Sequence, residues 1–189
     1  RRSALALPPR YIATSAAPGE IGRLGWALDA LAADAELPPL VVIAQPVPDA
    51  AVAGASDAAP DPGMSAAIPE ALRDRVHLVR PRELADVGAI LSGAELLAVP
   101  QEHIGAGYEI LGALASGVPV VHSDCAATAE LTLDAGVSAA TAEEFAAALS
   151  RVTRDAGERQ RLAVLAEDRS RCFSWAGTAA LLWELHANI

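Results

Sequence analysis

The chain has 189 residues, which is enough for one domain with a buried core, and 52% of them are hydrophobic. Its formal net charge is −10, and all 14 basic residues are arginines. A uniformly acidic chain repels a phosphate backbone, so general binding to nucleic acid or to an anionic membrane is not expected. The two cysteines, Cys125 and Cys172, are too few for a disulfide framework and are typical of a reducing, cytoplasmic location.

Short apolar runs alternate with helical patterns along the first half of the chain. Strands are predicted at residues 11–14 and 39–45, the second being apolar on both faces, as a buried parallel strand requires. Between them, apolar residues recur at helical spacing after Pro18. Residues 46–64 are rich in Pro, Ala, Asp and Gly and have no periodicity, which predicts a long mobile loop.

The middle of the chain continues the alternation of strands and helices. A short helix at 69–75 and strands at 76–79, 96–99 and 118–121 are predicted, with a helix opening at Pro81 before the second of these strands. A loop at 102–107 leads into a helix at 108–116, which Gly117 ends as a left-handed cap.

The last third reads as mainly helical. Thr141 and Glu144 have the spacing of a capping box, and two further helices are expected over 157–171 and from Ser174 onward. The three tryptophans, Trp26, Trp175 and Trp183, fall on helices and are expected to pack against neighbours. The chain is thus predicted to be a single domain over 1–189, with C-terminal helices at 157–189 and no membrane span.

Strands alternating with helices predict an α/β fold, a three-layer α/β/α sandwich around about six parallel strands. Ligands of such Rossmann-like sheets bind at the carboxyl ends of the strands. Three loops follow those ends, at 15–22, 100–107 and 122–128. The candidate site is therefore expected among them.

The stretch from Pro100 to Asp124 is the most informative part of the sequence. It consists of a glycine loop, a helix, a glycine cap and a strand. Gly105 and Gly107 allow a ligand to approach the backbone closely, and the helix that follows points its free N–H groups at the loop. A diphosphate or a sugar hydroxyl suits that position, although a purely structural turn has the same composition.

The same stretch resembles a known family. Pro100, then Gly105 and Gly107, then Ala113–Val121 (ALASGVPVV) match without a gap the pattern of the retaining GT-B glycosyltransferases of group 1, also called family 4. The likeness extends to Glu130 and to the segment from Phe173 (FSWAGTAALLWEL), and covers nearly the whole chain. The chain is similar to the C-terminal, nucleotide-sugar-binding half of these enzymes.

The resemblance implies a function and a partner. The chain would form one half of a GT-B fold and bind a nucleotide diphosphate sugar as substrate, whose sugar passes to an acceptor hydroxyl. No cofactor and no metal are implied. The acceptor would bind to an N-terminal domain in the same chain or in a separate one, and any peripheral membrane association would lie in that domain.

The chain also departs from the family pattern. The two family glutamates that contact the donor sugar and the ribose fall on Ile104 and Gly112. Glu102 and Glu109 are candidate substitutes, with Gly112 leaving room for a ribose, or they are simply solvated carboxylates. Of the family's basic pair that grips the diphosphate, only Arg23 is found in the corresponding region.

The histidines His103 and His122 flank the predicted ligand loops and could contact a phosphate or a sugar. No spacing of metal ligands and no set of nucleophile and base is recognisable, so no catalytic residue is assigned. The predicted nucleotide-sugar-binding residues are Arg23, Glu102, His103, Gly105, Ala106, Gly107, Tyr108, Glu109 and Gly112.

Two alternatives to an active transferase remain open at this point. The loss of both family glutamates favours a catalytically degenerate glycosyltransferase-like domain with a binding or scaffolding role. A nucleotide-sugar epimerase of the same fold is the other alternative. Neither the donor base, the donor sugar nor the acceptor follows from the sequence.

Overall fold

The computed structural model describes residues 3–16, 24–44, 65–101, 104, 105 and 107–187. Within them, six strands form one parallel sheet in the order β3-β2-β1-β4-β5-β6. The strands are β1 (Ile12–Ala16), β2 (Leu40–Ala44), β3 (Val76–Val79), β4 (Leu96–Val99), β5 (Val120–Ser123) and β6 (Gly136–Ala139). The prediction of an α/β fold with about six parallel strands is confirmed.

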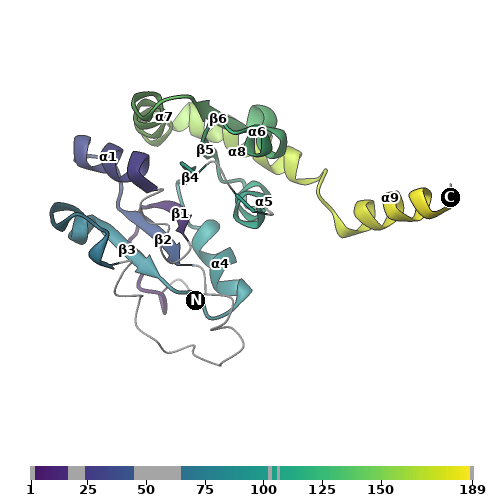
Figure 1. Cartoon of the computed structure of the whole chain (residues 1–189), viewed down its shortest axis with the longest axis horizontal. Coiled ribbons are helices and arrows are strands. Elements are labelled where there is room, and N and C mark those ends of the chain that lie inside the picture. Colours follow the sequence, from purple (N-terminus) through teal and green to yellow (C-terminus); the bar gives the residue numbers. More distant parts are fainter. Residues whose placement is uncertain (1–2, 17–23, 45–64, 102–103, 106, 188–189) are drawn as a thin grey trace.

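Helices cover both faces of this sheet (Figure 1). The described helices are α1 (Gly25–Ala33), η2 (Glu70–Arg75), α4 (Leu84–Leu91), α5 (Tyr108–Ala115), α6 (Ala126–Thr132), η3 (Leu133–Ala135), α7 (Ala142–Arg154), α8 (Ala156–Ser170) and α9 (Trp175–Ala187), the last of which lies away from the sheet. α1 and α7 lie on one side of the strands, and α4 and α5 lie on the other. The molecule is therefore the three-layer sandwich expected from the sequence.

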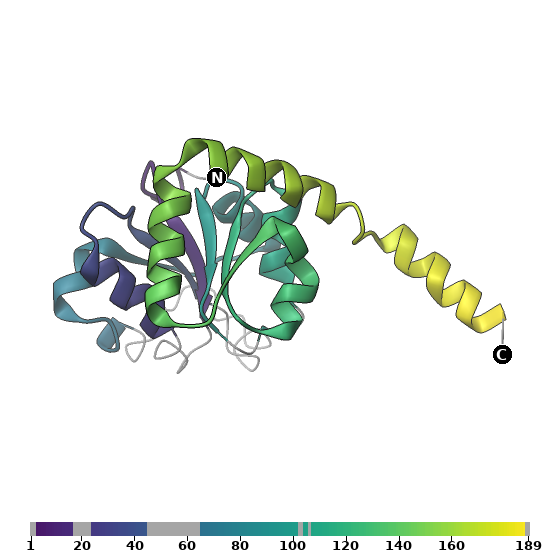
Figure 2. The same ribbon diagram turned by 90° about the horizontal axis from the view of Figure 1, so that it is seen from above.

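Two hydrophobic cores lie between these layers. Leu31 of α1 and Phe145 of α7 belong to one core, and Ile90 of α4 and Leu114 of α5 belong to the other. The strands supply both cores because successive side chains point to opposite faces, and β2 is buried along its whole length. α8 crosses from one core to the other (Figure 2), since its Leu162 lies in the first and its Ala166 in the second.

The predicted strands at 76–79 and 96–99 match the structure residue for residue. The strand predicted at 118–121 lies two residues later, at Val120–Ser123, and Pro119 joins the sheet only through its carbonyl, which accepts from the N–H of Leu97 at 2.8 Å. Proline has no N–H to donate to the ladder, which is why the strand starts after it.

Other predicted features can be compared with the structure in the same way. Gly117 has the predicted left-handed conformation, with a φ of 63°. The hydroxyl of Thr141 accepts from the N–H of Glu144, but the carboxylate of Glu144 reaches back to the N–H of Ala140 rather than to Thr141. The loop predicted at 46–64 and the helix start at Pro18 lie outside the described residues.

The prediction for the tryptophans is wrong for two of the three. Trp26 is partly buried and its ring centre lies 5.9 Å from that of Phe145. Trp175 and Trp183 are 84% and 74% exposed, and α9 has no buried residue among those described. Figures 1 and 2 show why, because α9 projects away from the body of the molecule. No described helix is long and apolar enough to cross a membrane.

Candidate functional site

The sheet opens at its carboxyl edge between β1 and β4. β1 pairs with β2 from Ile12 to Ala16, whereas its pairing with β4 ends at Ala13 and Leu97. Strand order reverses at the same place, because β2 and β3 extend to one side of β1 while β4 to β6 extend to the other. Open α/β sheets bind their ligands at such a switch point, which makes this edge the candidate functional site.

Two glycines shape the turn that follows β4. Gly105 and Gly107 have φ angles of 55° and 66°, in the left-handed region that glycine enters without strain. The N–H of Gly107 donates to the carbonyl of Ile104 at 2.9 Å and closes the turn. Gly105 is exposed, and no described atom lies within 4 Å of a Cβ built on it, so the backbone at this point is open to a ligand.

Gly107 has a different environment. A Cβ built on it would lie 2.6 Å from Cδ1 of Leu131 in α6 and 3.4 Å from Cδ1 of Ile104. Its missing side chain therefore allows α6 to pack tightly against the turn. The two glycines therefore have different roles. Gly107 allows the turn to pack against α6, and Gly105 leaves the backbone of the turn exposed.

α5 begins directly at this turn. Gly107 is its N-cap and has no side chain with which to bond the N–H groups of the first helical turn. Those N–H groups and the helix dipole give the end of α5 a partial positive charge that favours an anion. Tyr108, the first residue of α5, is 68% exposed, and Glu109 beside it is partly buried.

Gln101 is a residue whose place in the site the sequence did not indicate. Its side-chain amide donates to the carbonyl oxygen of Ser15 at 2.5 Å, across the opening between β1 and β4. Its own backbone carbonyl accepts from the hydroxyl of Ser123 at 3.1 Å. No local signal in the sequence could reveal a partner that lies 86 positions away.

His122 does not reach the surface of the site. It is 2% exposed, and its Nδ1 donates to the carbonyl oxygen of Ser123 at 2.8 Å. Its Nε2 lies 3.2 Å from the hydroxyl oxygen of Thr132, which itself donates to the carbonyl of Thr128 at 2.9 Å. Burial lowers the pKa of His122. Because its side chain is almost fully buried and bonds the carbonyl of Ser123, the interpretation of this histidine as a ligand contact is wrong.

Four of the nine predicted binding residues, Arg23, Glu102, His103 and Ala106, lie outside the described residues. The other five, Gly105, Gly107, Tyr108, Glu109 and Gly112, lie on the turn after β4 and on α5.

The two positions of the family glutamates have apolar surroundings. The side chain of Ile104 packs against the core that lies beneath α5. A Cβ built on Gly112 would lie 2.8 Å from Cδ1 of Leu91, so the expected room for a ribose is occupied by α4 in that direction. A binding role for Gly112 remains a prediction.

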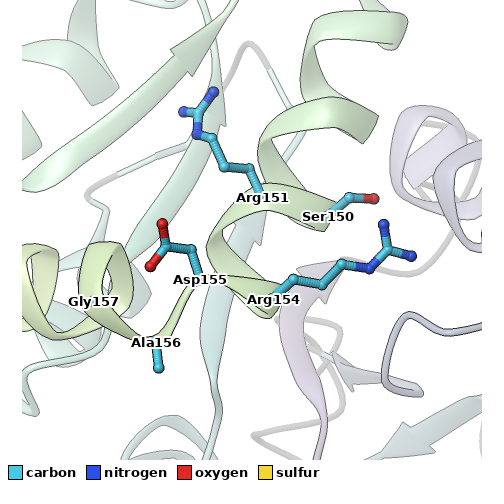
Figure 3. Close-up of a pocket in the computed structure, with 6 residues that line it drawn as sticks. All are labelled: Ser150, Arg151, Arg154, Asp155, Ala156 and Gly157. Atoms are coloured by element: carbon cyan, nitrogen blue, oxygen red, sulfur yellow. The ribbon is translucent and has the colours of Figure 1, made fainter.

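A cluster of charged residues beside a surface hollow lies away from this edge. A hollow of about 620 Å³ is lined by residues at the turn between α7 and α8, among them Arg151 and Arg154 (Figure 3). Both arginines are matched by carboxylates: Arg154 contacts Asp34 at 2.7 Å, and Arg151 contacts Glu158 at 3.0 Å. α7 begins beyond the carboxyl end of β6 and runs back along the sheet, so this cluster lies toward the opposite edge.

A metal ion has no obvious place in the described part of the chain. No group of three or more His, Cys, Asp or Glu side chains with metal-binding geometry occurs among the described residues. The features that the switch point does offer are backbone N–H groups, an exposed glycine and an exposed aromatic ring.

Comparison with known proteins identifies the family. Residues 21–155 match the family model described as glycosyl transferases group 1. The chain belongs to this family. The resemblance inferred from the stretch around Gly105 and Gly107 is thereby confirmed, and sugar transfer is the general activity of the group.

Curated and solved relatives agree with this assignment. D-inositol 3-phosphate glycosyltransferase from Corynebacterium glutamicum (strain R) is 31% identical over 116 residues, which are 59% of this chain and 28% of that protein. Sucrose-phosphate synthase from Thermosynechococcus elongatus superposes with a TM-score of 0.76 at 19% identity, over 99% of this chain and 47% of that one. HepE from Anabaena in complex with UDP superposes with a TM-score of 0.74 at 17% identity, over 100% and 51%. The chain thus spans about half the length of these solved glycosyltransferases, and the GT-B likeness of its fold is confirmed.

Proposed function

We propose that this group 1 glycosyltransferase chain is the donor-binding half of the enzyme and binds a nucleotide diphosphate sugar at the switch point. The diphosphate would lie against the N-terminus of α5, and the sugar would lie beside the turn at Gly105. The observation that carries the proposal is the open backbone at Gly105, directly before a helix end without a capping side chain. The presence of UDP in the structure of HepE supports it.

The reaction would be transfer of the sugar to an acceptor hydroxyl. The bond between the anomeric carbon and the diphosphate oxygen breaks, and the electron pair leaves with the diphosphate. The acceptor oxygen bonds to the anomeric carbon on the face that the diphosphate has left, which retains the configuration, and the acceptor proton passes to the leaving phosphate oxygen. The N–H groups of α5 would stabilise the negative charge that develops on the diphosphate.

The acceptor would bind to a second domain, which α9 would contact. Trp175, Leu181 and Trp183 of α9 are 84%, 69% and 74% exposed. α9 is mainly apolar, and an apolar helix surface of this kind is normally buried, so α9 would pack against a covering surface. The chain spans about half the length of its solved relatives, and the other half of a GT-B fold would supply the surface that covers α9.

One observation favours the degenerate alternative. The two positions of the family glutamates hold Ile104 and Gly112, so neither carries a carboxylate. Ile104 packs on the core, and Gly112 lies against Leu91. A domain with this site could bind a donor without transferring its sugar. Binding and transfer must therefore be measured separately.

The test is calorimetry of the full-length protein with UDP, GDP, UDP-glucose and GDP-mannose. Binding of one of them, weakened in G105A because the new Cβ enters the open space, supports the proposal. A matched control is R154A, which changes the opposite edge and should bind normally. Absence of binding by all four ligands would contradict donor binding. Binding without any transfer to added acceptors would favour the degenerate domain.

A further inference from the structure

Gln101, which connects β4 to the glycine turn, is hydrogen-bonded to both neighbouring strands. The side-chain amide of Gln101 donates to the carbonyl oxygen of Ser15, the next-to-last residue of β1, at 2.5 Å. The hydroxyl of Ser123, the last residue of β5, donates to the backbone carbonyl of Gln101 at 3.1 Å. Both neighbouring strands of β4 thus reach the same residue at their carboxyl ends.

The contact with Ser15 replaces a strand pairing that is missing. The β1–β4 ladder ends at Ala13 and Leu97, while β1 continues to Ala16 beside β2. Beyond that point, no backbone pairing between the two strands is found among the residues that the structure describes. The amide of Gln101 is long enough to cross the gap and bond the main chain of β1, so it sets the width of the opening at the switch point.

The contact with Ser123 is backed by buried, hydrogen-bonded neighbours. Ser123 is 3% exposed, and its own carbonyl accepts from Nδ1 of the buried His122 at 2.8 Å. His122 is in turn held against Thr132 of α6, and α6 also carries Leu131, which packs on Gly107. The start of the turn at Gln101 and its end at Gly107 are therefore both fixed to the same part of the domain.

We propose that Gln101 is a positioning residue for the donor site: it holds the turn at Gly105 and the start of α5 at the correct distance from β1 without contacting the donor itself. This inference rests on the proposed donor-binding function. It assigns a role to a neutral side chain at a point where the fold supplies no backbone pairing. The N–H groups of α5 can stabilise a diphosphate only when they are already in place, because ordering them on binding costs affinity.

The experiment compares Q101A and Q101E with the matched control S116A in the full-length protein. Q101E keeps the length of the side chain but presents a carboxylate to the carbonyl of Ser15. The hydroxyl of Ser116 donates to the carbonyl of Gly112 at 2.8 Å, so S116A removes one hydrogen bond of the same kind at the far end of α5. The measurements are UDP affinity by calorimetry, hydrogen exchange of the amides of residues 107–110, and melting temperature.

We expect Q101A and Q101E to bind UDP about three- to tenfold more weakly than the wild type, with faster amide exchange at 107–110. S116A should leave both quantities unchanged, and all three variants should melt within about 3 °C of one another. Unchanged exchange and affinity in Q101A and Q101E would overturn the inference. A melting temperature far below that of S116A would also overturn it, because Gln101 would then hold the fold rather than the turn.

The failure of the proposed function is distinguishable from the failure of this inference. If the wild type binds none of UDP, GDP, UDP-glucose and GDP-mannose, donor binding is refuted, but the exchange rates at 107–110 still decide whether Gln101 holds the turn. If UDP binds but Q101A leaves the exchange rates at 107–110 unchanged, donor binding is supported and the positioning role of Gln101 is refuted.

Discussion

Cδ1 of Leu131 lies 2.6 Å from the position that a Cβ on Gly107 would occupy, so α6 and the turn before α5 are in contact without any intervening side chain. The backbone carbonyl of the same leucine accepts from Nε of Arg169 in α8 at 2.9 Å. A link of packed and hydrogen-bonded groups therefore runs from α8 through α6 to the candidate donor site. The turn is exposed to solvent on one side and tightly supported on the other.

This contact makes the two glycines of the turn respond differently to substitution. G105A places a methyl group in open space at positive φ, which should cost about 1 kcal/mol of unfolding free energy. G107A adds the collision with Leu131 and should cost about 2–4 kcal/mol. Urea denaturation of the two variants measures both values. Adding L131A to G107A should recover part of the loss, and equal costs for the two single variants would show that Leu131 does not restrict the turn.

The buried His122 predicts a pH dependence of stability. Burial lowers the pKa of His122 below its ordinary value of 6.5, although the contact with Ser123 and the charge of Asp124 act in the opposite direction. The unfolded chain then binds a proton at higher pH than the folded chain does. The contribution of His122 is therefore complete above about pH 6.5 and declines as the pH falls below that value.

The measurement is urea denaturation between pH 5 and pH 8 for the wild type and H122N. The difference in unfolding free energy between the two should shrink as the pH is lowered. Only the wild type has an imidazole that binds a proton more readily in the unfolded chain than in the folded chain, where it is buried. A difference that stays constant with pH would mean that His122 keeps the same protonation state in the folded and unfolded chains.

The arginine cluster at the α7–α8 turn should not take part in donor binding. Arg154 contacts Asp34 at 2.7 Å and Glu36 at 3.1 Å, with 53% of its own side chain exposed. Exposed pairs of this kind contribute little, so R154A should cost at most about 1 kcal/mol and leave UDP affinity unchanged. Calorimetry and urea denaturation test this together. A marked loss of UDP affinity in R154A would move the candidate site to the hollow in Figure 3.

α9 should contribute almost nothing to the stability of the described domain. None of its residues is buried, so a chain that ends after Phe173 should unfold within about 0.5 kcal/mol of the whole chain. L162A in α8 is the contrasting control, because Leu162 is 1% exposed and its truncation should cost about 2–5 kcal/mol. Urea denaturation measures both.

The fluorescence of Trp175 and Trp183 tests whether α9 is covered in a longer protein. In a W26F background, their emission should be that of exposed indole in the 189-residue chain and should shift to shorter wavelength when the other half of a GT-B fold is present. An unchanged emission in the longer protein would contradict the proposed contact.

Several elements could be predicted because their local pattern and their environment agree. β4 is a short, fully buried apolar run that ends before Pro100. β3 is a short run of Val76, Leu78 and Val79 with His77 between them, and it is only partly buried at the edge of the sheet. β6, by contrast, was not found in the sequence. Its residues Gly136–Ala139 lie at the edge of the sheet, only Ala139 among them is buried, and they include a glycine and a serine, so no apolar run marks them. α6 was missed as a helix, since Ala126–Thr132 has neither a capping side chain nor a regular apolar stripe.

The amino-acid sequence by itself determined the class of fold and the glycine turn, because hydrophobic periodicity and the conformational freedom of glycine are local properties. Only the tertiary structure decided which residues support that turn. Gln101 and Ser15 are 86 positions apart in the sequence. They meet because the order of strands places β1 beside β4 and because the pairing of these two strands ends before their carboxyl ends. Burial likewise removed His122 from the site and left Trp183 in solvent, since exposure depends on what packs against a residue rather than on its own chemistry.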